Sequence, residues 1–311
     1  MRGFLLVDKP AGPTSHDVVA QIRKRSKCRR VGHCGTLDPG ATGLLVLALE
    51  EATRLAKFAT FLAKEYRVKA VLGVATSTDD AQGEVLEEQE RVTVSEAEVR
   101  QVVERFRGSQ KQVPPMVSAL HHKGRRLYEL AREGQWVERE ARKIEVSELE
   151  LLAFHQGGHP ILDLRMVVSA GTYVRTLCAD IGKALEIPAH AAEIRRTRVG
   201  AWRAEDALSL EIALEMAGTG ALERALIPIE QADLGLPVVT LSKTAVGALL
   251  RGTGVRALPK QGVVAGGQMC LAAGPSGRIV ALCRSGAGGE GGVALLPERL
   301  LVATAGAADE D

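Results

Sequence analysis

Apolar residues occur in short patterned stretches along the chain. Continuous apolar runs at residues 3–7 and 44–49 are typical of strands that are buried on both faces. Residues 66–74 and 162–168 instead alternate apolar side chains with polar or small ones, as half-buried strands do. Stretches with helical spacing lie between these runs. The pattern predicts a domain in which strands and helices are interspersed.

Capping signals place the starts of two helices. Thr14 with Asp17, and Ser95 with Glu98, show the capping-box pattern, in which a hydroxyl and a carboxylate three residues later satisfy the first free N–H groups of a helix. Residues 55–62 also keep helical spacing. We therefore expect helices after residues 14 and 95 and across 55–62.

A further helix is expected after residues 170–172. Tyr173, Arg175, Leu177 and Ile181 fall within it. Arg175 stands in the first turn, where the helix dipole disfavours a positive charge. An anionic partner for Arg175 is therefore expected.

Changes in periodicity and composition divide the chain into regions. Between residues 108 and 143 the periodicity weakens and the composition turns basic, which indicates an insertion outside the core. Beyond Pro237, short apolar runs such as 262–271 and 277–282 alternate with frequent glycine, which is typical of a small β domain. The expected divisions are a main domain over 1–235 with a basic insertion at about 108–143, a β domain over 236–304 and a disordered tail over 305–311.

The composition is that of a soluble globular protein, with 46% hydrophobic and 25% charged residues among 311. The formal net charge is only +2, so any attraction to phosphate must come from local clusters. A basic cluster by itself is more often a solvated face than a binding site. The clusters lie at residues 23–30, 121–126, 139–143 and 195–198.

The five cysteines are odd in number and form no C-x-x-C pair, which argues against both a disulfide framework and a zinc site. The short apolar run after Met1 is too short for a signal sequence, and no stretch approaches the length of a membrane span. We therefore expect a cytoplasmic protein that makes no membrane contact.

One carboxylate stands out because of its surroundings. Asp38 lies in an otherwise uncharged, Gly-rich loop, GHCGTLDPGATGLL at residues 32–45, directly after the basic run at 23–30. A carboxylate in a loop shielded from water can act as a general acid, a nucleophile or a metal ligand. The combination suggests an acid that acts on nucleic acid, and it leaves a nuclease, a glycosylase or a simple anion site open.

The neighbouring residues argue against two roles for this loop, namely metal coordination and phosphate binding by a P-loop. His33 and Cys34 cannot both point the same way from adjacent positions on an extended chain, and no second carboxylate or imidazole is spaced for metal coordination. The pattern G-x-x-x-x-G-K-[ST] is also absent, so the glycines do not form a P-loop. Covalent or electrostatic catalysis without a metal remains.

The loop resembles GHTGTLDPLATGVL, a motif of the bacterial tRNA pseudouridine synthases of the TruB family. Further motifs of that family appear in order: residues 7–15 resemble its opening D-K-P-x-G-x-T-S, residues 64–66 its K-x-Y strand, and residues 171–176 (GTYVRT) its G-T-Y-I-R-T. Residues 114–116, 118–120 and 124–132 resemble its insertion, which implies that the segment at about 108–143 is an RNA-clamping insertion. The resemblance covers about residues 3–235.

This resemblance implies an α+β fold, in which a mixed, mostly antiparallel central sheet is flanked by helices and followed by a small C-terminal PUA-like β domain. It also implies an isomerase that converts the T-loop uridine at tRNA position 55 to pseudouridine, with Asp38 as the nucleophile. Glycosidic cleavage builds positive charge at C1′, which a carboxylate can stabilise or trap. Addition of Asp38 to C6 of the uracil is an open alternative.

The same resemblance assigns roles to five other residues. Tyr66 would stack on the flipped uracil, and Arg175 would pair with Asp38 and keep its carboxylate ionised. His33 would contact the T-loop at the place the base has left, while Tyr173 and Ile194 would line the pocket. Without the resemblance, each is as readily a structural or surface residue.

Two further residues receive different assignments. Asp80 falls in the family's acidic T-x-D-x-x-G turn, although a solvated turn aspartate is an alternative. Lys9 next to Pro10 is interpreted as a structural residue that supports the Asp38 loop and has no catalytic role.

The chain departs from the family pattern at several positions. Cys34 replaces the usual Thr, Gly40 the usual Leu, Ser77 a frequent Asp and Val117 a frequent Tyr, and histidines at 121–122 occupy a segment that commonly begins with Lys. Gly40 removes a packing side chain just after the proposed nucleophile and adds backbone freedom. The loop is therefore expected to be less rigid than in its relatives.

The expected partner is the T-arm of tRNA, bound by a monomer that needs no protein partner. One alternative is a relative that modifies ribosomal RNA under a guide RNA, as archaeal and eukaryotic members do, but the short C-terminal part without a long basic tail disfavours it. A non-catalytic RNA chaperone that uses the same surface is a second alternative. Retention of Asp38, Tyr66 and Arg175 favours catalysis.

Overall fold

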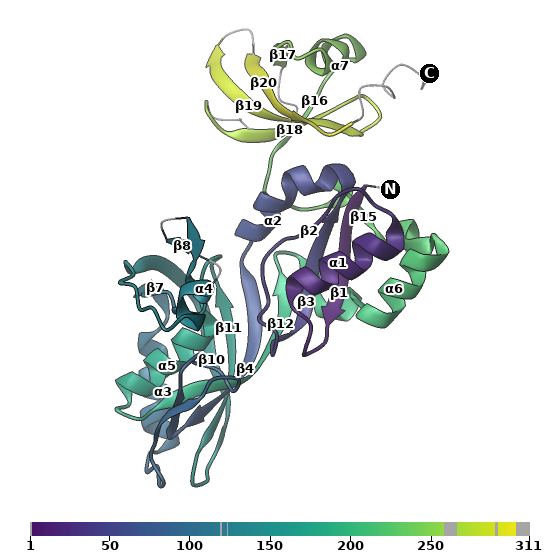
Figure 1. Cartoon of the computed structure of the whole chain (residues 1–311). Helices are drawn as coiled ribbons and strands as arrows, with labels where there is room; N and C mark the ends of the chain where they lie inside the picture. The colour runs from purple at the N-terminus through teal and green to yellow at the C-terminus, as the bar shows by residue number, and fades with distance from the viewer. Residues whose placement is uncertain (1, 119, 123, 258–265, 290–291, 303–311) are drawn as a thin grey trace.

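The computed structural model describes residues 2–118, 120–122, 124–257, 266–289 and 292–302. A large domain built on a mixed sheet comes first in the chain, and a small β domain follows it (Figure 1). Residues 258–265 and 303–311 lie outside the described part, which therefore does not include the predicted tail or residues 262–265 of the apolar run at 262–271. No helix of the described part combines the length and the apolar character needed to cross a membrane.

The main sheet has eleven strands in the described residues, and eight of them follow the order β14-β1-β3-β12-β4-β11-β10-β7. Only the β1–β14 and β3–β12 pairs are parallel. The expected mixed, mostly antiparallel sheet is therefore confirmed. The strands are β1 (Gly3–Lys9), β2 (Val31–His33), β3 (Thr42–Leu49), β4 (Lys64–Leu72), β7 (Gly108–Gln112), β10 (Arg142–His155), β11 (Ile161–Val168), β12 (Ala189–Val199), β13 (Trp202–Arg203), β14 (Leu208–Ser209) and β15 (Ile227–Pro228).

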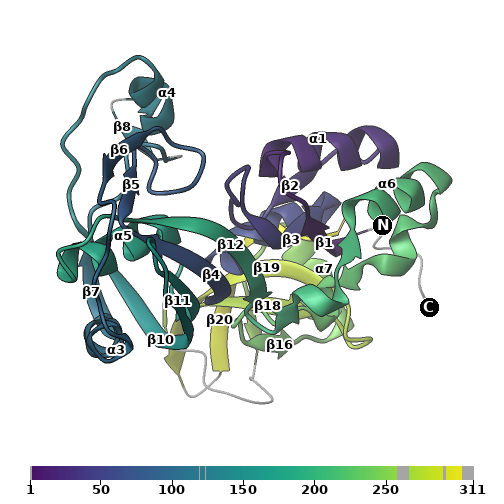
Figure 2. The same ribbon diagram turned by 90° about the horizontal axis from the view of Figure 1, so that it is seen from below.

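Among the described residues, the main domain has six helices, and two short hairpins stand outside its sheet. The hairpins pair β5 (Val74–Thr76) with β6 (Val85–Glu88) and β8 (His121–His122) with β9 (Arg125–Arg126). In Figure 2 the elements α4 and β8 stand on the same side of the sheet as the β5–β6 hairpin. The helices are α1 (Ser15–Ser26), α2 (Ala56–Phe61), α3 (Glu96–Arg105), α4 (Leu127–Arg132), α5 (Val174–Ala184) and α6 (Leu210–Thr219), and the 3-10 helices are Glu50–Leu55, Ala204–Asp206, Ala221–Ala225 and Ile229–Gln231.

Both predicted capping boxes are present. The backbone N–H of Asp17 donates to the Thr14 hydroxyl across 3.0 Å, and the N–H of Thr14 donates to the Asp17 carboxylate across 2.9 Å. Ser95 and Glu98 make the same exchange at the start of α3. Local sequence therefore determines where these two helices begin.

Strands β1 and β3 are buried on both faces, as their continuous apolar runs predict. One face, which includes Leu5 and Leu47, packs in the same core cluster as residues of α1, α3 and α5. The other face, which includes Phe4 and Val46, belongs to a second core cluster that also contains residues of the C-terminal domain such as Leu282. By contrast, β4 alternates buried and exposed positions, because only one of its faces meets this core.

Glycine geometry explains why β4 ends at Leu72, two residues before the end of the predicted run at 66–74. Gly73 adopts a φ of +97°, and a Cβ atom there would lie 2.6 Å from the ring of His159. Only glycine accepts that conformation and approach readily. The chain turns at Gly73, and Val74 begins β5 instead of continuing β4.

The segment predicted as an insertion begins and ends in the sheet. Its first residues form the edge strand β7, which pairs with the start of β10, so Arg142 lies opposite Gln112. The 14-residue strand β10 was not foreseen, because its alternation is interrupted by register shifts near Ser147 and Leu152. The part outside the sheet is therefore shorter than 108–143.

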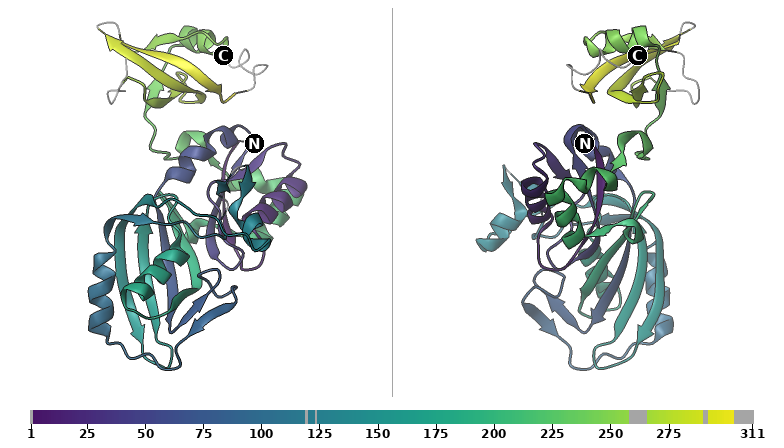
Figure 3. Two further views of the ribbon diagram at one scale, coloured as in Figure 1. Left: turned by 60° about the vertical axis from the view of Figure 1, so that its left-hand side comes forward. Right: turned by 90° about the vertical axis from the view of Figure 1, so that its right-hand side faces the viewer.

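As far as the structure describes it, the C-terminal domain is a five-stranded sheet with the order β16-β18-β19-β20-β17 and one helix. The guanidinium of Arg2, from the first residues of the chain, donates to the carbonyls of Ile279 and Leu301 across 3.2 and 2.8 Å. Figures 1 and 3 show this sheet beyond the end of the main domain that carries α2. Its elements are β16 (Val238–Thr240), α7 (Lys243–Leu250), β17 (Val255–Ala257), β18 (Met269–Ala273), β19 (Ile279–Gly289) and β20 (Gly292–Leu300).

Candidate active site

The loop that carries Asp38 connects β2 to β3 and is held by the segment that follows β1. The Ser15 hydroxyl accepts a hydrogen bond from the N–H of Leu37 across 2.8 Å and donates to the carbonyl of Leu37 across 3.0 Å. The N–H of Gly12 donates to the carbonyl of Pro39 across 2.9 Å. Residues directly before and after Asp38 are therefore fixed to one neighbouring segment.

Lys9 supports this loop from within the protein. Its side chain is fully buried, and its ammonium donates to the carbonyls of Pro10, Pro13 and Pro39 across 2.8, 2.9 and 3.1 Å. Burial lowers the pKa of Lys9 to about 8, with the Asp38 carboxylate opposing that effect and Arg196 adding to it. These contacts agree with the structural interpretation of Lys9.

Arg196 on β12 joins the two ends of the loop. Its guanidinium donates to the carbonyl of Leu44 across 2.7 Å, to that of Thr36 across 3.2 Å and to that of Gly35 across 3.1 Å. The side chain is only 1% exposed. Gly43 permits this approach, because a Cβ atom there would lie 2.2 Å from the Arg196 carbonyl oxygen.

Residues 195–198, one of the basic clusters in the sequence, do not form a single solvated basic surface. Arg196 is buried, and Arg195 forms an ion pair with Asp8 at 2.7 Å. The positions alternate between the two faces of β12, so adjacent basic residues cannot share one surface. By contrast, Arg23, Lys24 and Arg25 at the end of α1 are exposed.

Arg175, in the first turn of α5, has the anionic partner that the sequence predicts. Its Nε donates to Oδ2 of Asp38 across 2.8 Å, and its Nη2 lies 3.5 Å from Oδ1. The remaining N–H groups of the guanidinium donate to the carbonyls of Thr78 and Val117. The Arg175 side chain is 3% exposed and that of Asp38 41%, so a buried cation holds a carboxylate that solvent can reach.

Asp80 belongs to the same cluster and is not a solvated turn residue. Its carboxylate lies 3.5 Å from Nε of Arg175, and its side chain is 16% exposed. It also accepts hydrogen bonds from the Thr78 hydroxyl and from the N–H of Gln82. Two carboxylates therefore share one buried guanidinium.

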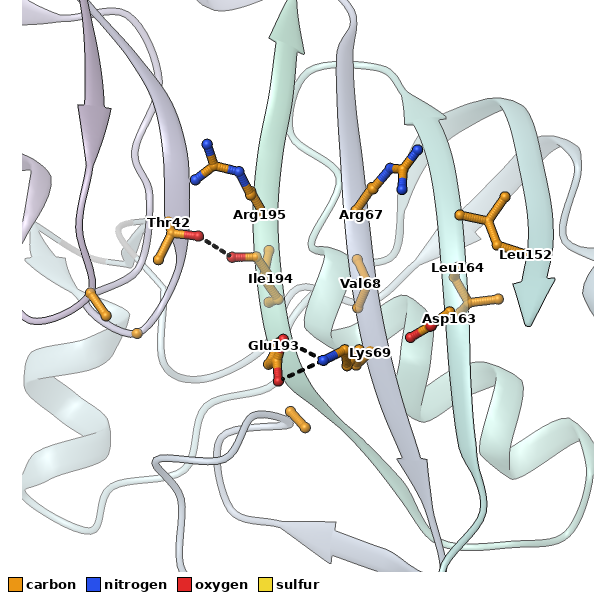
Figure 4. A pocket seen from close by; sticks show the side chains of 13 residues that line it. Thr42, Arg67, Val68, Lys69, Leu152, Asp163, Leu164, Glu193, Ile194 and Arg195 are labelled. Carbon is orange, nitrogen blue, oxygen red and sulfur yellow. Dashed lines mark hydrogen bonds and ion pairs between the residues drawn. The ribbon is translucent and has the colours of Figure 1, made fainter. Parts of the chain in front are cut away.

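A small pocket of about 30 Å³ brings Asp38, Asp80 and Ile194 together. This volume suits one or two water molecules, so a larger ligand enters only if the lining moves. A neighbouring open pocket of about 470 Å³ shares Gly40 and Ile194 with it and runs over β12, β4 and β11 (Figure 4). Lys69 and Glu193 form an ion pair at 3.0 Å in this second pocket.

Tyr173 is positioned by a side chain that the sequence did not single out. It precedes α5 as the N-cap residue, one position before the helix in which it was expected. The amide of Gln112 on β7 accepts from the Tyr173 N–H across 2.8 Å and donates to the Tyr173 carbonyl across 3.0 Å. Burial raises the pKa of the Tyr173 hydroxyl.

Tyr66 and His33 lie on strands next to the loop but are not among the described residues that line the Asp38 pocket. Tyr66 is 7% exposed and packs in the core cluster that includes Leu37 and Ala41, on either side of Asp38. His33 is half-buried at the end of β2, five residues before Asp38.

Gly40 and Cys34 are two of the positions at which the chain departs from the family pattern, and the structure shows which residues surround each of them. The side chain of Gln82 lies where a residue at position 40 would pack, because a Cβ atom on Gly40 would meet its Cδ at 3.2 Å. Cys34 is fully buried in an apolar cluster, and burial raises the pKa of its thiol to about 12. Cys34 is therefore an inert core residue.

Arg196, Gln112 and Asp79 are site residues that sequence reasoning missed. Asp79 accepts a hydrogen bond from the Thr176 hydroxyl across 3.1 Å, and burial raises the pKa of its carboxyl. The doubled aspartate at 79–80 was the available signal for it, whereas nothing local marks a buried glutamine or arginine. In the described part of the chain, His, Cys, Asp and Glu side chains form no group of three that could hold a metal ion.

Comparison with known proteins places the chain in a family. Residues 23–174 match the N-terminal domain of the TruB family pseudouridylate synthases, and residues 175–232 match the tRNA pseudouridylate synthase B C-terminal domain. The tRNA pseudouridine synthase B of Syntrophomonas wolfei is 40% identical over 92% of this chain and 94% of its own length. That of Opitutus terrae is 45% identical over 74% of this chain and 94% of its own length.

Solved structures share the fold over the whole chain. A chain in the structure described as a Cbf5-Nop10-Gar1 complex superimposes with a TM-score of 0.77 at 29% identity, covering 99% of this chain and 87% of that one. A chain from an H/ACA RNP bound to a substrate RNA containing 2′-deoxyuridine gives a TM-score of 0.74 at 27% identity, covering 97% and 86%. With matched domains across residues 23–232 and relatives 40–45% identical, the chain belongs to the TruB family of pseudouridine synthases.

Proposed function

We propose that this chain isomerises the uridine at position 55 in the T-loop of tRNA to pseudouridine, with Asp38 as the nucleophile. The observation that carries the proposal is the Asp38–Arg175 pair, in which a buried guanidinium orients a solvent-accessible carboxylate at a pocket. The relatives that are 40–45% identical over most of the chain are named as tRNA pseudouridine synthases.

The proposed reaction starts with a flipped uridine. The Asp38 pocket holds only about 30 Å³, so the base enters when a rim residue such as Gln82 moves aside. Tyr66 would stack on the uracil once the pocket extends toward the core, His33 would contact the T-loop, and Tyr173 and Ile194 would line the base. Asp80 would help Arg175 to keep its position.

Asp38 then attacks either C1′ of the ribose or C6 of the uracil. In the first case the C1′–N1 bond breaks and the carboxylate traps the oxocarbenium-like centre, so the uracil leaves as an anion. The uracil turns, C5 bonds to C1′ as the carboxylate leaves, and the C5 proton is lost to solvent while a ring nitrogen gains one. Substrate and product have the same atoms apart from exchanged protons, so neither an oxidant nor a cofactor is needed.

The test uses a T-arm stem-loop that carries tritium at uracil C5, because its release reports the new carbon–carbon bond. The purified chain alone should release tritium, and Asp38→Ala should abolish release while RNA binding survives. Asp163→Ala provides a matched control, since it removes a carboxylate from the neighbouring pocket and should leave release intact. Persistent release by Asp38→Ala would show that Asp38 is not the nucleophile.

The same assay separates tRNA modification from guide-directed modification of another RNA. The chain shares its fold with chains of a Cbf5-Nop10-Gar1 complex and of an H/ACA RNP at 27–29% identity, yet its identity to relatives named tRNA pseudouridine synthase B is higher. We therefore expect a monomer to act on the isolated T-arm without a guide RNA or a partner protein. Activity that appears only when such components are added would reject the tRNA assignment.

A further inference from the structure

Trp136 is exposed to an extent that is rare for this residue type. Its exposed fraction is 72%, whereas the chain's other tryptophan, Trp202, is 7% exposed and packs against Phe4 with ring centroids 5.2 Å apart. A large apolar ring in water costs free energy, and exposed aromatic rings are common where a partner covers them. Folding alone gives no reason for the position of Trp136.

One face of the Trp136 ring is already occupied by a cation. The guanidinium carbon of Arg139 lies 5.5 Å from the ring centroid, in a cation–π contact that orients the ring. The Nε–H of Arg139 is buried and meets no hydrogen-bond acceptor among the residues that the structure describes. The pair therefore offers an open aromatic face beside a guanidinium that is not fully satisfied by the described residues.

This pair lies on the segment that borders the Asp38 site. The segment begins after Gln112, which holds Tyr173, and passes Val117, whose carbonyl accepts from Nη2 of Arg175 across 3.0 Å. On its return to the sheet, Arg139 acts electrostatically on Asp79, which accepts a hydrogen bond from Thr176 in the first turn of α5. Trp136 is thus three residues from Arg139, whose charge acts on the carboxylate of Asp79, as does that of Arg175.

We propose that Trp136 and Arg139 form a nucleotide subsite for the bound RNA, in which an unpaired base stacks on the free face of Trp136 and the guanidinium of Arg139 contacts a phosphate. Aromatic rings interleaved with arginine are the usual means of holding single-stranded nucleotides. The subsite takes a base outside the Asp38 pocket, so it adds affinity without taking part in the chemistry. This proposal depends on the proposed function in one respect, namely that the bound RNA is the T-arm of tRNA.

Tryptophan fluorescence of the full-length chain reports occupation of this subsite directly. Titration with an unlabelled T-arm stem-loop should quench the exposed Trp136, because a stacked base quenches indole emission, while the buried Trp202 should be unaffected. In Trp136→Phe the quench should disappear, and the remaining Trp202 emission shows whether the variant is folded. A blunt RNA duplex should bind in a salt-dependent manner without the quench.

Affinity supplies the second measurement. Trp136→Ala should weaken T-arm binding by about five- to 150-fold, the usual effect of losing one stacked base, whereas Trp136→Phe should retain most of the affinity. Phe61→Ala is the matched control, because Phe61 is 74% exposed on α2 and should not change T-arm binding. The maximal rate at saturating RNA should change little in Trp136→Ala.

Unchanged affinity in Trp136→Ala, or an equal quench by duplex and stem-loop, would overturn the subsite. These results are independent of tritium release, because binding and fluorescence are read without turnover. An active enzyme with no Trp136 effect would reject the subsite alone. A chain that binds the T-arm through Trp136 without releasing tritium would reject the proposed reaction alone.

Discussion

Arg175 donates from Nε to Oδ2 of Asp38 across 2.8 Å, although the two residues are 137 positions apart in the chain. The guanidinium also donates to carbonyls of two other segments, at Thr78 and Val117. Arg175 therefore joins the Asp38 loop, the β5–β6 hairpin and the segment after β7 in one arrangement, which a shorter or single-donor cation could not reproduce.

Replacement of Arg175 by lysine should lower the maximal rate much more than RNA affinity. The ammonium keeps the charge but cannot bond three segments at once, so the Asp38 carboxylate loses its orientation. We expect a fall in kcat of about 100-fold or more, with a change in Kd for the T-arm of less than about fivefold. Single-turnover kinetics and RNA binding measure the two effects, and equal losses in both would contradict an orienting role.

Arg196 should prove necessary for the geometry of the Asp38 loop. Arg196→Met removes the donors that serve the carbonyls of Gly35, Thr36 and Leu44, and burying an acceptor without a donor costs about 1–3 kcal/mol each. Since removal of a buried charge recovers part of that cost, we expect a net loss of about 2–4 kcal/mol in the free energy of unfolding. Urea denaturation measures the loss.

Arg195→Met is the matched control for Arg196. Arg195 is adjacent, but it is exposed and paired with Asp8 at the surface, so its loss should change stability by less than about 1 kcal/mol. Similar stability losses in the two variants would show that the loop contacts of Arg196 contribute no more to the free energy of unfolding than a surface ion pair does.

Gly40 and Gln82 should be energetically coupled. Gly40→Leu restores the residue usual in the family but brings its side chain against Gln82, whose Cδ would lie 3.2 Å from the new Cβ. We expect Gly40→Leu to reduce activity and Gln82→Ala in the same chain to restore much of it, with a coupling free energy of about 0.5–3 kcal/mol. A double-mutant cycle on kcat/KM measures the coupling, and strictly additive effects would refute it.

Lys9 should make stability rise with pH relative to a variant that lacks its amine. Its pKa is about 8 in the folded state against 10.5 ordinarily, so between these values the unfolded chain binds more protons and unfolding becomes less favourable as pH increases. From pH 7.5 to 9.5 the wild type should gain about 1–2 kcal/mol over Lys9→Met. Parallel urea melts at the two pH values test this, and an unchanged difference would show that the Lys9 ammonium is not destabilised by burial.

Much of the local structure follows from short stretches of sequence. The capping boxes at Thr14 and Ser95, the doubly buried strand β3 and the alternating strand β4 were all predicted, because each depends on neighbours within a few positions or on one periodicity. The interrupted alternation of β10 escaped prediction because two register shifts break the period of two.

The sequence by itself determined which loop is the candidate for the chemistry, since a lone carboxylate among glycines and the motif around Asp38 are local features. It also singled out Arg175 through its place in a first helical turn. Only the tertiary structure decided that Asp80 shares this guanidinium, that Arg196 is buried behind the loop and that Gln82 fills the space beside Gly40. These contacts join segments that are distant along the chain. They depend on strand order and packing, which no local sequence pattern records.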